Sequence, residues 1–366
     1  MTDRVYLDHA ATTPLRPAAA EAMREGFALW ANPSSPHTAG RAARAALEDA
    51  RERIKAALGW DGEVIITSGA SEAAAIALGM TPSTDNALIS AVEHPAIEMA
   101  AYKPSTLPVL SDGSLDPFKL KAALSDKALI ANVLEVGALD VAVQHVNSET
   151  GNRQDIDLIA SVVHKANGTL IVDCAQSAGK FPLPGAADMV IVSAHKFGGP
   201  VGVGALLMRD FALLEPTGGQ ERGYRHGTEN LPGALGMAAA LEAADDPYLN
   251  PIVLASLESF AGEVRASGGE WLSDRLYDPT AYIRAIAMPH LSGQVQLMRF
   301  DMAGIAVSQG SACSSGSLRR SHVLQAMGIG TDLADRTIRV SLGWNTTVAD
   351  IERFREVWLA MATDTR

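Results

Sequence analysis

The sequence predicts an α/β fold with a large lobe built around a mainly parallel, buried sheet. Two observations predict it. Through the first two-thirds of the chain, short runs of Val, Ile and Leu alternate with stretches of helical periodicity, which is the pattern of repeated strand–helix units. Beyond about residue 245, longer helices mix with isolated strands, so we expect a smaller α+β lobe there.

The first long helix is expected over residues 40–58. Apolar side chains recur there at helical spacing, and Gly59 follows the last of them, where a C-terminal cap belongs. A strand at 63–67, a turn of small polar residues and an alanine-rich helix come next. Strand, turn and helix in this order fit the alternating pattern of an α/β lobe.

Further apolar runs predict the remaining elements. In the large lobe, strands are expected at 87–91, 129–134, 169–173 and 188–193. A helix is expected at 155–166, which Asp155 can cap and which has an apolar face. In the small lobe, we expect helices at 255–266, 318–327 and 348–361, and strands at 283–288 and 338–342.

Composition and charge exclude several classes of protein. With 47% hydrophobic and 20% charged residues, the 366-residue chain can bury a large core and is not disordered. A net charge of −12 argues against a partner that is nucleic acid or an anionic membrane. Two cysteines cannot make a disulfide framework, and the start of the chain has no apolar run typical of a signal peptide. No stretch approaches the roughly 18 apolar residues of a membrane span, so we expect a cytoplasmic enzyme.

The segment 193–200 carries the clearest chemical signal. It reads Ser-Ala-His-Lys-Phe-Gly-Gly-Pro and places Lys196 just beyond the end of an apolar strand. Ligand-binding sites of α/β proteins lie at the carboxyl ends of such strands. An amine held there away from bulk water has a lowered pKa and can form a Schiff base with an aldehyde. Asp173 ends the preceding strand and can pair with a pyridinium nitrogen. Taken singly, Lys196 also fits a surface loop, and Asp173 a helix N-cap.

A second segment suits phosphate binding. Residues 67–72, Thr-Ser-Gly-Ala-Ser-Glu, follow a strand and open a helix, whose N-terminal N–H groups attract a phosphate. Ser193 and His195 beside the lysine could complete the cradle. The same residues also fit a plain capped turn with Ser71 as the N-cap.

The two cysteines have different surroundings. Cys313 lies among small polar residues at 308–317, where we expect an exposed loop suited to a thiolate nucleophile, with an incidental thiol as the alternative. Cys174 follows a buried strand and is expected in the core.

In their order along the chain, these residues resemble the cysteine desulfurases of the class-V aminotransferases, which use pyridoxal 5′-phosphate (PLP). The segment 6–14, Tyr-Leu-Asp-His-Ala-Ala-Thr-Thr-Pro, is similar to the family's amino-terminal signature. The Gly-Ser-Ala-Cys-Ser-Ser-Gly loop at 310–316 is similar to the branch that supplies sulfur for iron–sulfur cluster assembly. The other similar segments are 32–35, 93–94, 147–151, 173–176, 193–204, 222–228 and 338–343.

The resemblance implies the type I fold of PLP-dependent transferases. That fold has a large domain around a mainly parallel seven-stranded sheet and a smaller α+β domain. We therefore expect the large PLP-binding domain at 14–245 and the small domain at 1–13 and 246–366. The resemblance also implies a homodimer whose sites need both chains, L-cysteine as substrate, and a partner protein that accepts the sulfur.

The resemblance further implies a role for each site residue. Lys196 would hold PLP and move protons, and Cys313 would take sulfur from L-cysteine as a persulfide, leaving L-alanine. Arg339 would clamp the substrate carboxylate through its bidentate fork, with Ser148 and Asn32 as further substrate-binding residues. The remaining residues would hold the cofactor: His94 against the ring face, Asp173 at the ring nitrogen, Gln176 at the phenolic oxygen, Ala70, Ser71, Ser193 and His195 at the phosphate, and Thr228 at the phosphate from the other subunit.

Three features depart from the family pattern. Ser148 stands where the family usually has a second asparagine, the segment 246–300 is short, and the chain ends soon after Thr347, so docking to the usual scaffold protein is not implied. Two alternatives therefore stay open. One is an aminotransferase or lyase for another amino acid, including selenocysteine, and the other is a non-catalytic sulfur-handling protein. No metal site is expected, because the histidines are scattered and no His-Glu-x-x-His occurs.

Overall fold

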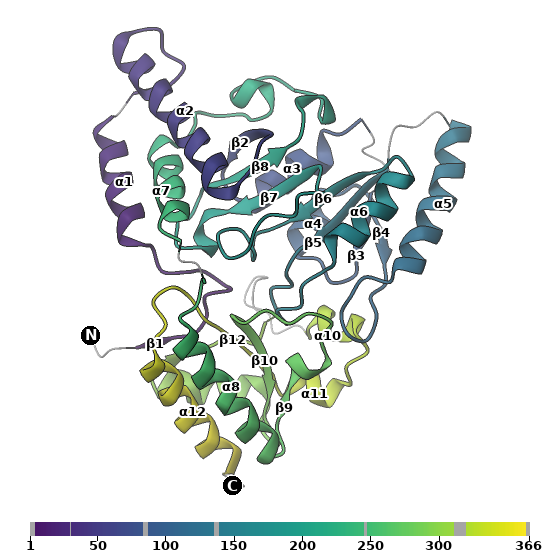
Figure 1. The fold of residues 1–366 in the computed structure, drawn as a ribbon, viewed down its shortest axis with the longest axis vertical. Coiled ribbons are helices and arrows are strands. Elements are labelled where there is room, and N and C mark those ends of the chain that lie inside the picture. The colour runs from purple at the N-terminus through teal and green to yellow at the C-terminus, as the bar shows by residue number, and fades with distance from the viewer. Residues whose placement is uncertain are drawn as a thin grey trace.

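A computed structural model of the chain describes residues 4–29, 31–82, 87–134, 139–244, 247–310 and 320–363 (Figure 1). A seven-stranded sheet occupies the upper part of the molecule in this view, and two smaller sheets lie in the lower part. Both chain ends lie in the lower part.

The large sheet has the strand order β2-β8-β7-β6-β5-β3-β4. The strands from β7 to β4 are parallel, and β8 runs antiparallel to both of its neighbours. Apolar side chains cover both faces of the sheet, which confirms the predicted mainly parallel, buried sheet. The strands are β2 (Glu63–Thr67), β3 (Leu88–Ser90), β4 (Ser105–Leu107), β5 (Asp140–Gln144), β6 (Thr169–Asp173), β7 (Met189–Ser193) and β8 (Gly204–Met208).

Helices surround this sheet, and two of them begin or end as predicted. The long helix α2 buries one apolar face and ends at Gly59, whose φ of 62° is the left-handed conformation that favours glycine. Helix α6 begins after Asp155, whose side chain accepts the backbone N–H of Leu158. The helices are α1 (Pro17–Ala28), α2 (Thr38–Leu58), α3 (Ala70–Gly79), α4 (Pro95–Ala100), α5 (Pro117–Leu134), α6 (Ile156–Lys165) and α7 (Leu231–Glu242).

The strand predicted at 129–134 is wrong, because these residues form the last part of α5. Asp116 and Pro117 start that helix: the Asp116 carboxylate accepts the N–H groups of Phe118 and Lys119 at 2.9 and 3.1 Å. The helix then continues through the apolar run, and the strand follows at 140–144, where all five residues are buried. A short apolar run alone does not distinguish a strand from a buried helix. Strand β8 was not predicted either.

The lower part contains a three-stranded antiparallel sheet, β12-β10-β9, packed against α8 and α12. Phe260 is central to this core, with its ring edge-on to those of Trp271, Phe354 and Trp358. The elements are α8 (Pro251–Ala266), β9 (Glu270–Trp271), β10 (Ile283–Ala287), α9 (Gly293–Met302), α10 (His322–Ala326), α11 (Thr331–Asp335), β12 (Thr337–Ser341) and α12 (Val348–Thr363).

The first strand, β1 (Val5–Tyr6), pairs in parallel with β11 (Ile305–Ala306), so the start of the chain lies with its last third. The domain boundaries predicted at residues 14 and 246 stay a prediction. The predicted helix 318–327 begins later, at His322, and residues 318 and 319 lie outside the described chain. Short 3-10 helices complete the fold: η1 (Ala194–Lys196), η2 (Phe211–Leu213), η3 (Glu221–Gly223) and η4 (Leu272–Arg275).

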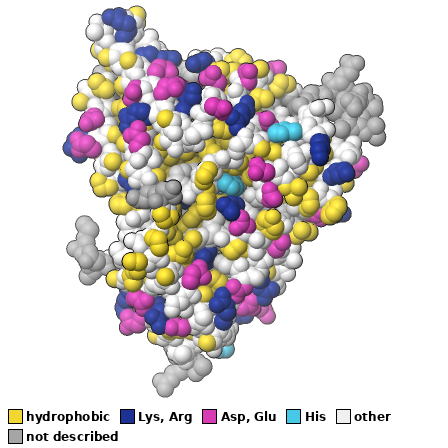
Figure 2. Space-filling model, viewed as in Figure 1, with side chains coloured by type: hydrophobic (Ala, Val, Ile, Leu, Met, Phe, Trp, Pro, Cys, Tyr) yellow, Lys and Arg dark blue, Asp and Glu magenta, His cyan; other side chains and the backbone are white. Residues whose placement is uncertain are grey.

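On the face seen in Figure 2, hydrophobic side chains gather across the middle of the molecule, where the part with the large sheet meets the part with the small sheets. Acidic and basic side chains predominate toward the two ends of this face. Within the described ranges, no helix combines the length and apolar character needed to cross a membrane.

Candidate active site

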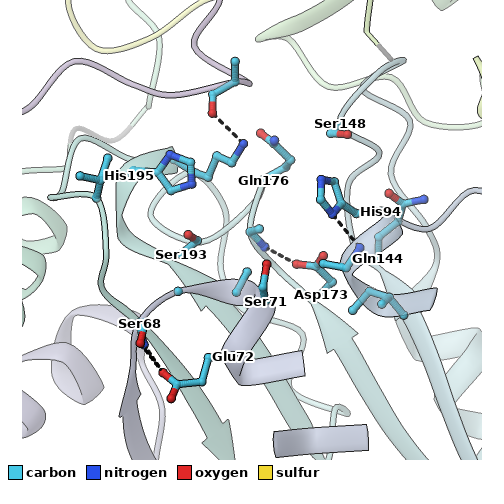
Figure 3. Close-up of a pocket in the computed structure, with 18 of the residues that line it drawn as sticks. Ser68, Ser71, Glu72, His94, Gln144, Ser148, Asp173, Gln176, Ser193 and His195 are labelled. Carbon is cyan, nitrogen blue, oxygen red and sulfur yellow. Dashed lines mark hydrogen bonds between the residues drawn. The ribbon is translucent and has the colours of Figure 1, made fainter. Parts of the chain in front are cut away.

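A cavity of about 590 Å³ opens where β6 and β7 end and α3 begins (Figure 3). The labelled side chains from the large sheet and its helices surround one common space in this view. The cavity brings together nine of the predicted site residues: Ala70, Ser71, His94, Ser148, Asp173, Gln176, Ser193, His195 and Lys196.

Lys196 ends the short helix η1, which follows β7 directly. Its Nζ donates hydrogen bonds to the backbone carbonyl oxygens of Ala10 and Ala11, at 2.6 and 2.9 Å. The turn after the lysine requires glycine at Gly198, where φ is 91° and a Cβ atom would come within 2.7 Å of the Arg16 side chain. Lys196 is therefore a primary amine held inside the cavity by backbone carbonyls from the start of the chain.

Asp173 lies at the end of β6, next to β7 in the sheet. This confirms that the strand ends carrying Asp173 and Lys196 are neighbours. Burial raises the pKa of the Asp173 carboxyl, while a 2.8 Å hydrogen bond from the N–H of Ala175 and the nearby charge of Lys196 oppose that rise. A cationic N–H placed against Asp173 would favour its charged form, which is the partner that a pyridinium ring needs.

The turn between β2 and α3 brings backbone N–H groups to the cavity. Gly69 is the N-cap of α3, with φ of 143° and no side-chain cap hydrogen bond, so Ser71 is a first-turn residue and not the N-cap. A Cβ atom on Gly204 would lie 2.7 Å from the Cα of Gly69, so the approach of β8 to this turn requires glycine. The first N–H groups of α3 thus face the cavity beside Ser193 and His195, as an anion site requires.

Hydrogen bonds and an ion pair between side chains stabilise the conformation of this turn. The Ser68 N–H and hydroxyl both donate to a carboxylate oxygen of Glu72, and Arg225 pairs with the same carboxylate at 3.0 Å. Burial opposes ionisation of Glu72, but the hydrogen bonds from Ser68 and Arg225 leave its pKa below the ordinary value. A charged carboxylate therefore fixes the shape of the turn.

His94 is the N-cap of α4, and its Nδ1 accepts the backbone N–H of Ala96 at 3.1 Å. Burial, with the charge of Lys196 as the next cause, lowers its pKa. Because Nδ1 accepts the hydrogen bond from Ala96, the neutral ring carries its proton on Nε2, and the lowered pKa favours that neutral form. The capping bond and a place in the cavity wall are compatible, so His94 has a structural role without losing access to a ligand.

His195 lies on the opposite side of the cavity from His94 in Figure 3. Burial, followed by the charges of Lys196 and Lys180, lowers its pKa to about 4. One of its ring nitrogens is 3.2 Å from the hydroxyl of Thr12. A neutral imidazole can donate one hydrogen bond to an anion at this position.

Sequence reasoning missed several cavity residues, of which Gln144 is the most informative. Gln144 ends β5 directly opposite Asp173 in the register of the sheet. Misplacing β5 at 129–134 hid this strand end, because the parallel neighbour of β6 could not be identified. The other missed residues include Ala96, Ile97 and Val146.

Three predicted residues lie in the described chain but do not line the cavity, and a fourth cannot be placed. Asn32 is exposed and its side-chain oxygen accepts the N–H of Ser34 at 2.8 Å, and Thr228 is also exposed. Arg339 is 1% exposed and lies behind Ser148, to whose carbonyl its Nη1 donates at 2.9 Å. Cys313 falls outside the described residues.

Cys174 is fully buried in the core of the large sheet, as predicted. Burial raises the pKa of its thiol far above the usual range. A thiol that stays protonated and inaccessible is a poor nucleophile, so Cys174 is no candidate for sulfur chemistry.

Comparisons with known proteins agree with this site. Residues 5–354 match the family model described as aminotransferase class-V. A cysteine desulfurase from Cereibacter sphaeroides is 36% identical over 97% of this chain and 95% of its own length. The cysteine desulfurase IscS from Dictyoglomus turgidum is 34% identical over 96% of this chain and 92% of its own length. Among solved structures, a NifS-like protein from Rickettsia africae superposes with a TM-score of 0.84 at 29% identity, covering 98% of this chain and 99% of that one.

The family model spans most of the chain, and the relatives match it nearly from end to end. The cavity brings a strand-end lysine, a strand-end aspartate and the N-terminus of α3 together in one space. The chain belongs to the class-V aminotransferase family and, within it, to the cysteine desulfurases.

Proposed function

We propose that this protein is a PLP-dependent cysteine desulfurase that converts L-cysteine to L-alanine and passes the sulfur through Cys313 to an acceptor protein. One observation carries the proposal. The Lys196 amine and the Asp173 carboxylate lie at adjacent strand ends of one cavity, beside the open N-terminus of α3. The cysteine desulfurase relatives support the choice of L-cysteine as substrate.

The residues present fit PLP. When bound, PLP supplies an aldehyde that captures amines and a ring that withdraws electrons from the substrate α-carbon. Asp173 would face the ring nitrogen, and the first turn of α3 with Ser71, Ser193 and His195 would hold the phosphate. The buried Oε1 of Gln176, which has no hydrogen-bond partner in the described chain, leaves a polar position at the cavity for a ligand.

The remaining residues divide the work of the reaction. The Lys196 amine would take the α-proton of L-cysteine and return a proton as alanine forms, since an amine within the cavity can act as base and then as acid. Arg339 would bind the substrate carboxylate. The Cys313 thiolate would attack the substrate sulfur, the C–S bond would break with its electron pair left on carbon, and the products would be L-alanine and a persulfide on Cys313.

We also propose a homodimer in which Thr228 reaches the phosphate site of the partner chain. Thr228 and Asn32 are exposed in a single chain and lie outside its cavity, which fits a role that needs a second copy. Sedimentation of the parent and of a Thr228→Ala variant tests this: both should be dimers, and the variant should lose PLP more readily on dialysis.

The first experiment is a turnover assay on purified protein loaded with PLP. After addition of L-cysteine and a thiol reductant, alanine and sulfide should form in equal amounts. Cys313→Ala should stop sulfide formation while keeping the bound cofactor. Cys174→Ala is the matched control, which should keep both sulfide formation and the bound cofactor. Sulfide release by Cys313→Ala at the parental rate would contradict the proposed nucleophile.

A second candidate function is transamination or lysis of another amino acid, because Ser148 lines the cavity at the position where the family usually carries asparagine. Its shorter side chain leaves more room near the substrate. Formation of a keto acid from a substrate without sulfur, and no sulfide from L-cysteine, would favour this second function.

A further inference from the structure

Arg339 is a buried guanidinium with a carboxylate already beside it. Its Nη2 donates to Asp8 Oδ1 at 2.7 Å, and its Nη1 donates to the carbonyl of Ser148 at 2.9 Å. The arginine side chain is 1% exposed and the aspartate side chain 21%. Within the described chain, the buried Nε of Arg339 has no hydrogen-bond partner. One Nη group of the guanidinium thus donates to this protein's own carboxylate, and the Nε–H is left without a partner in the described chain.

The fold fixes both members of this pair. Arg339 lies in the middle of β12, and its backbone pairs with that of Ser308. Asp8 follows β1 and forms a parallel bridge to Ser341 on the same strand, two residues beyond the arginine. The tyrosine hydroxyl of Tyr6 also donates to the Asp8 carbonyl oxygen at 3.2 Å. The pair therefore joins the amino-terminal segment to β12 at the rear of the cavity wall.

Asp8 supplies the negative charge that compensates Arg339. The other nearby acid, Glu149, is buried, and burial raises the pKa of its carboxyl, while the Ser321 hydroxyl at 2.5 Å and the charges of His322 and Arg339 oppose that rise. In the described chain, Asp8 is the carboxylate that forms an ion pair with Arg339. The attraction between this guanidinium and a substrate carboxylate is therefore weaker, because the charge of Asp8 already offsets that of Arg339.

We propose that Asp8 is a positioning residue that sets how strongly Arg339 binds a carboxylate: it holds the guanidinium in place behind Ser148 and weakens its attraction for the carboxylate of an α-amino acid substrate. The inference rests on the proposed function, because it assigns the substrate carboxylate to Arg339. Replacing Asp8 by the isosteric asparagine keeps an oxygen acceptor for Nη2 but removes the negative charge. Carboxylate binding should then become tighter, since the bound anion would meet an uncompensated cation.

The test measures binding of two fragments of L-cysteine to the PLP-loaded protein by calorimetry. 3-Mercaptopropionate has the thiol and carboxylate of the substrate but no amine, and cysteamine has the thiol and amine but no carboxylate. Asp8→Asn should lower the Kd of 3-mercaptopropionate about fivefold or more and leave the Kd of cysteamine unchanged. An unchanged or higher Kd for 3-mercaptopropionate would overturn the inference.

Three variants make the result specific. Asp278→Asn is the matched control. Asp278 forms an ion pair with Arg153 at 2.6 Å, and neither residue lines the cavity, so this variant should change neither Kd. Arg339→Gln should weaken 3-mercaptopropionate binding and abolish the difference that Asp8→Asn makes. Asp8→Ser, which is neutral and smaller, repeats the charge test if the asparagine variant does not fold.

The binding test separates this inference from the proposed function. Tighter 3-mercaptopropionate binding by Asp8→Asn, in a protein that forms no alanine from L-cysteine, would support the inference and refute the desulfurase reaction. Alanine formation by the parent, with no tightening in Asp8→Asn, would leave the proposed function standing and refute the role of Asp8.

Discussion

The two main sheets of this protein contribute to the site in different ways. The seven-stranded sheet presents Asp173 and Lys196 at the ends of parallel strands, where the chain turns from strand to loop. The three-stranded antiparallel sheet presents Arg339 from the middle of β12, with its partner Asp8 held by a bridge to the same strand. The first arrangement depends on strand order, and the second on pairing between the two ends of the chain.

This difference shows which functional residues can be predicted from a sequence alone. A polar residue that ends an apolar run in a parallel sheet points to the site edge, because all carboxyl ends of parallel strands meet there. An arginine inside an antiparallel strand carries no such signal, since its neighbours come from distant segments. Four predictions test this contrast, beginning with the largest effect.

Lys196→Ala should lower the rate of alanine formation about 10⁴-fold, because the large sheet then lacks its amine for proton transfer. The visible absorption of the cofactor should also disappear or shift. Lys165→Ala, on the exposed end of α6, is the matched control and should behave as the parent. A Lys196→Ala variant within tenfold of the parental rate would show that the reaction does not depend on this strand end.

Asp173→Asn should reduce kcat about 10³-fold, because the amide cannot compensate a charged ring nitrogen. The comparison residue is Asp188, which precedes β7 at the opposite edge of the same sheet and accepts the N–H of Leu170 at 2.7 Å. Asp188→Asn should affect stability more than kcat. Equal losses of kcat in the two variants would mean that the carboxyl edge of the sheet has no special role.

Arg339→Lys should raise KM for L-cysteine so that kcat/KM falls about 100-fold, with a smaller change in kcat, because lysine cannot reproduce the two-pronged contact of a guanidinium. Steady-state rates over a range of L-cysteine concentrations measure both parameters. A fall in kcat at unchanged KM would instead assign Arg339 to a step after substrate binding.

Two buried histidines allow the pH response of the two regions to be compared. Burial is the main cause that lowers the pKa of His9 to about 3 and that of His145 to about 4, with Lys180 and Arg153 as the next causes. Both values lie below the unfolded value of about 6.5, so on acidification the unfolded chain takes up protons first. These two histidines should therefore lower the free energy of unfolding by about 2.5 kcal/mol each, or about 5 kcal/mol together, between pH 7 and pH 4.5.

Urea unfolding at several pH values measures this fall. His145 directly follows β5 of the large sheet, with a ring nitrogen 3.0 Å from the hydroxyl of Ser177, and His9 packs against Gly343 near the small sheet. His145→Gln should remove about half of the dependence and leave the contribution of His9. A stability that does not change down to pH 4.5 would contradict the lowered pKa values.

The sequence alone predicted much of the fold and of the large-sheet site. The helix ending at Gly59, the strands 63–67 and 169–173, and the adjacency of Asp173 and Lys196 follow from apolar periodicity, capping residues and the geometry of parallel sheets. The strand expected at 129–134 was wrong, since an apolar run inside a capped helix has no local mark that distinguishes it from a strand. Gln144 was missed for the same reason.

The sequence by itself determined the chemical inventory of this protein: a strand-end lysine and aspartate, an open helix start after a glycine turn, and a cysteine in a polar segment. The tertiary structure decided which of these groups share a cavity and which polar groups are already paired. Asp8 and Arg339 lie at opposite ends of the chain, and only the pairing of the amino-terminal segment with β12 brings them within 2.7 Å. Side-chain pairs of this kind depend on long-range strand register, which no local pattern encodes.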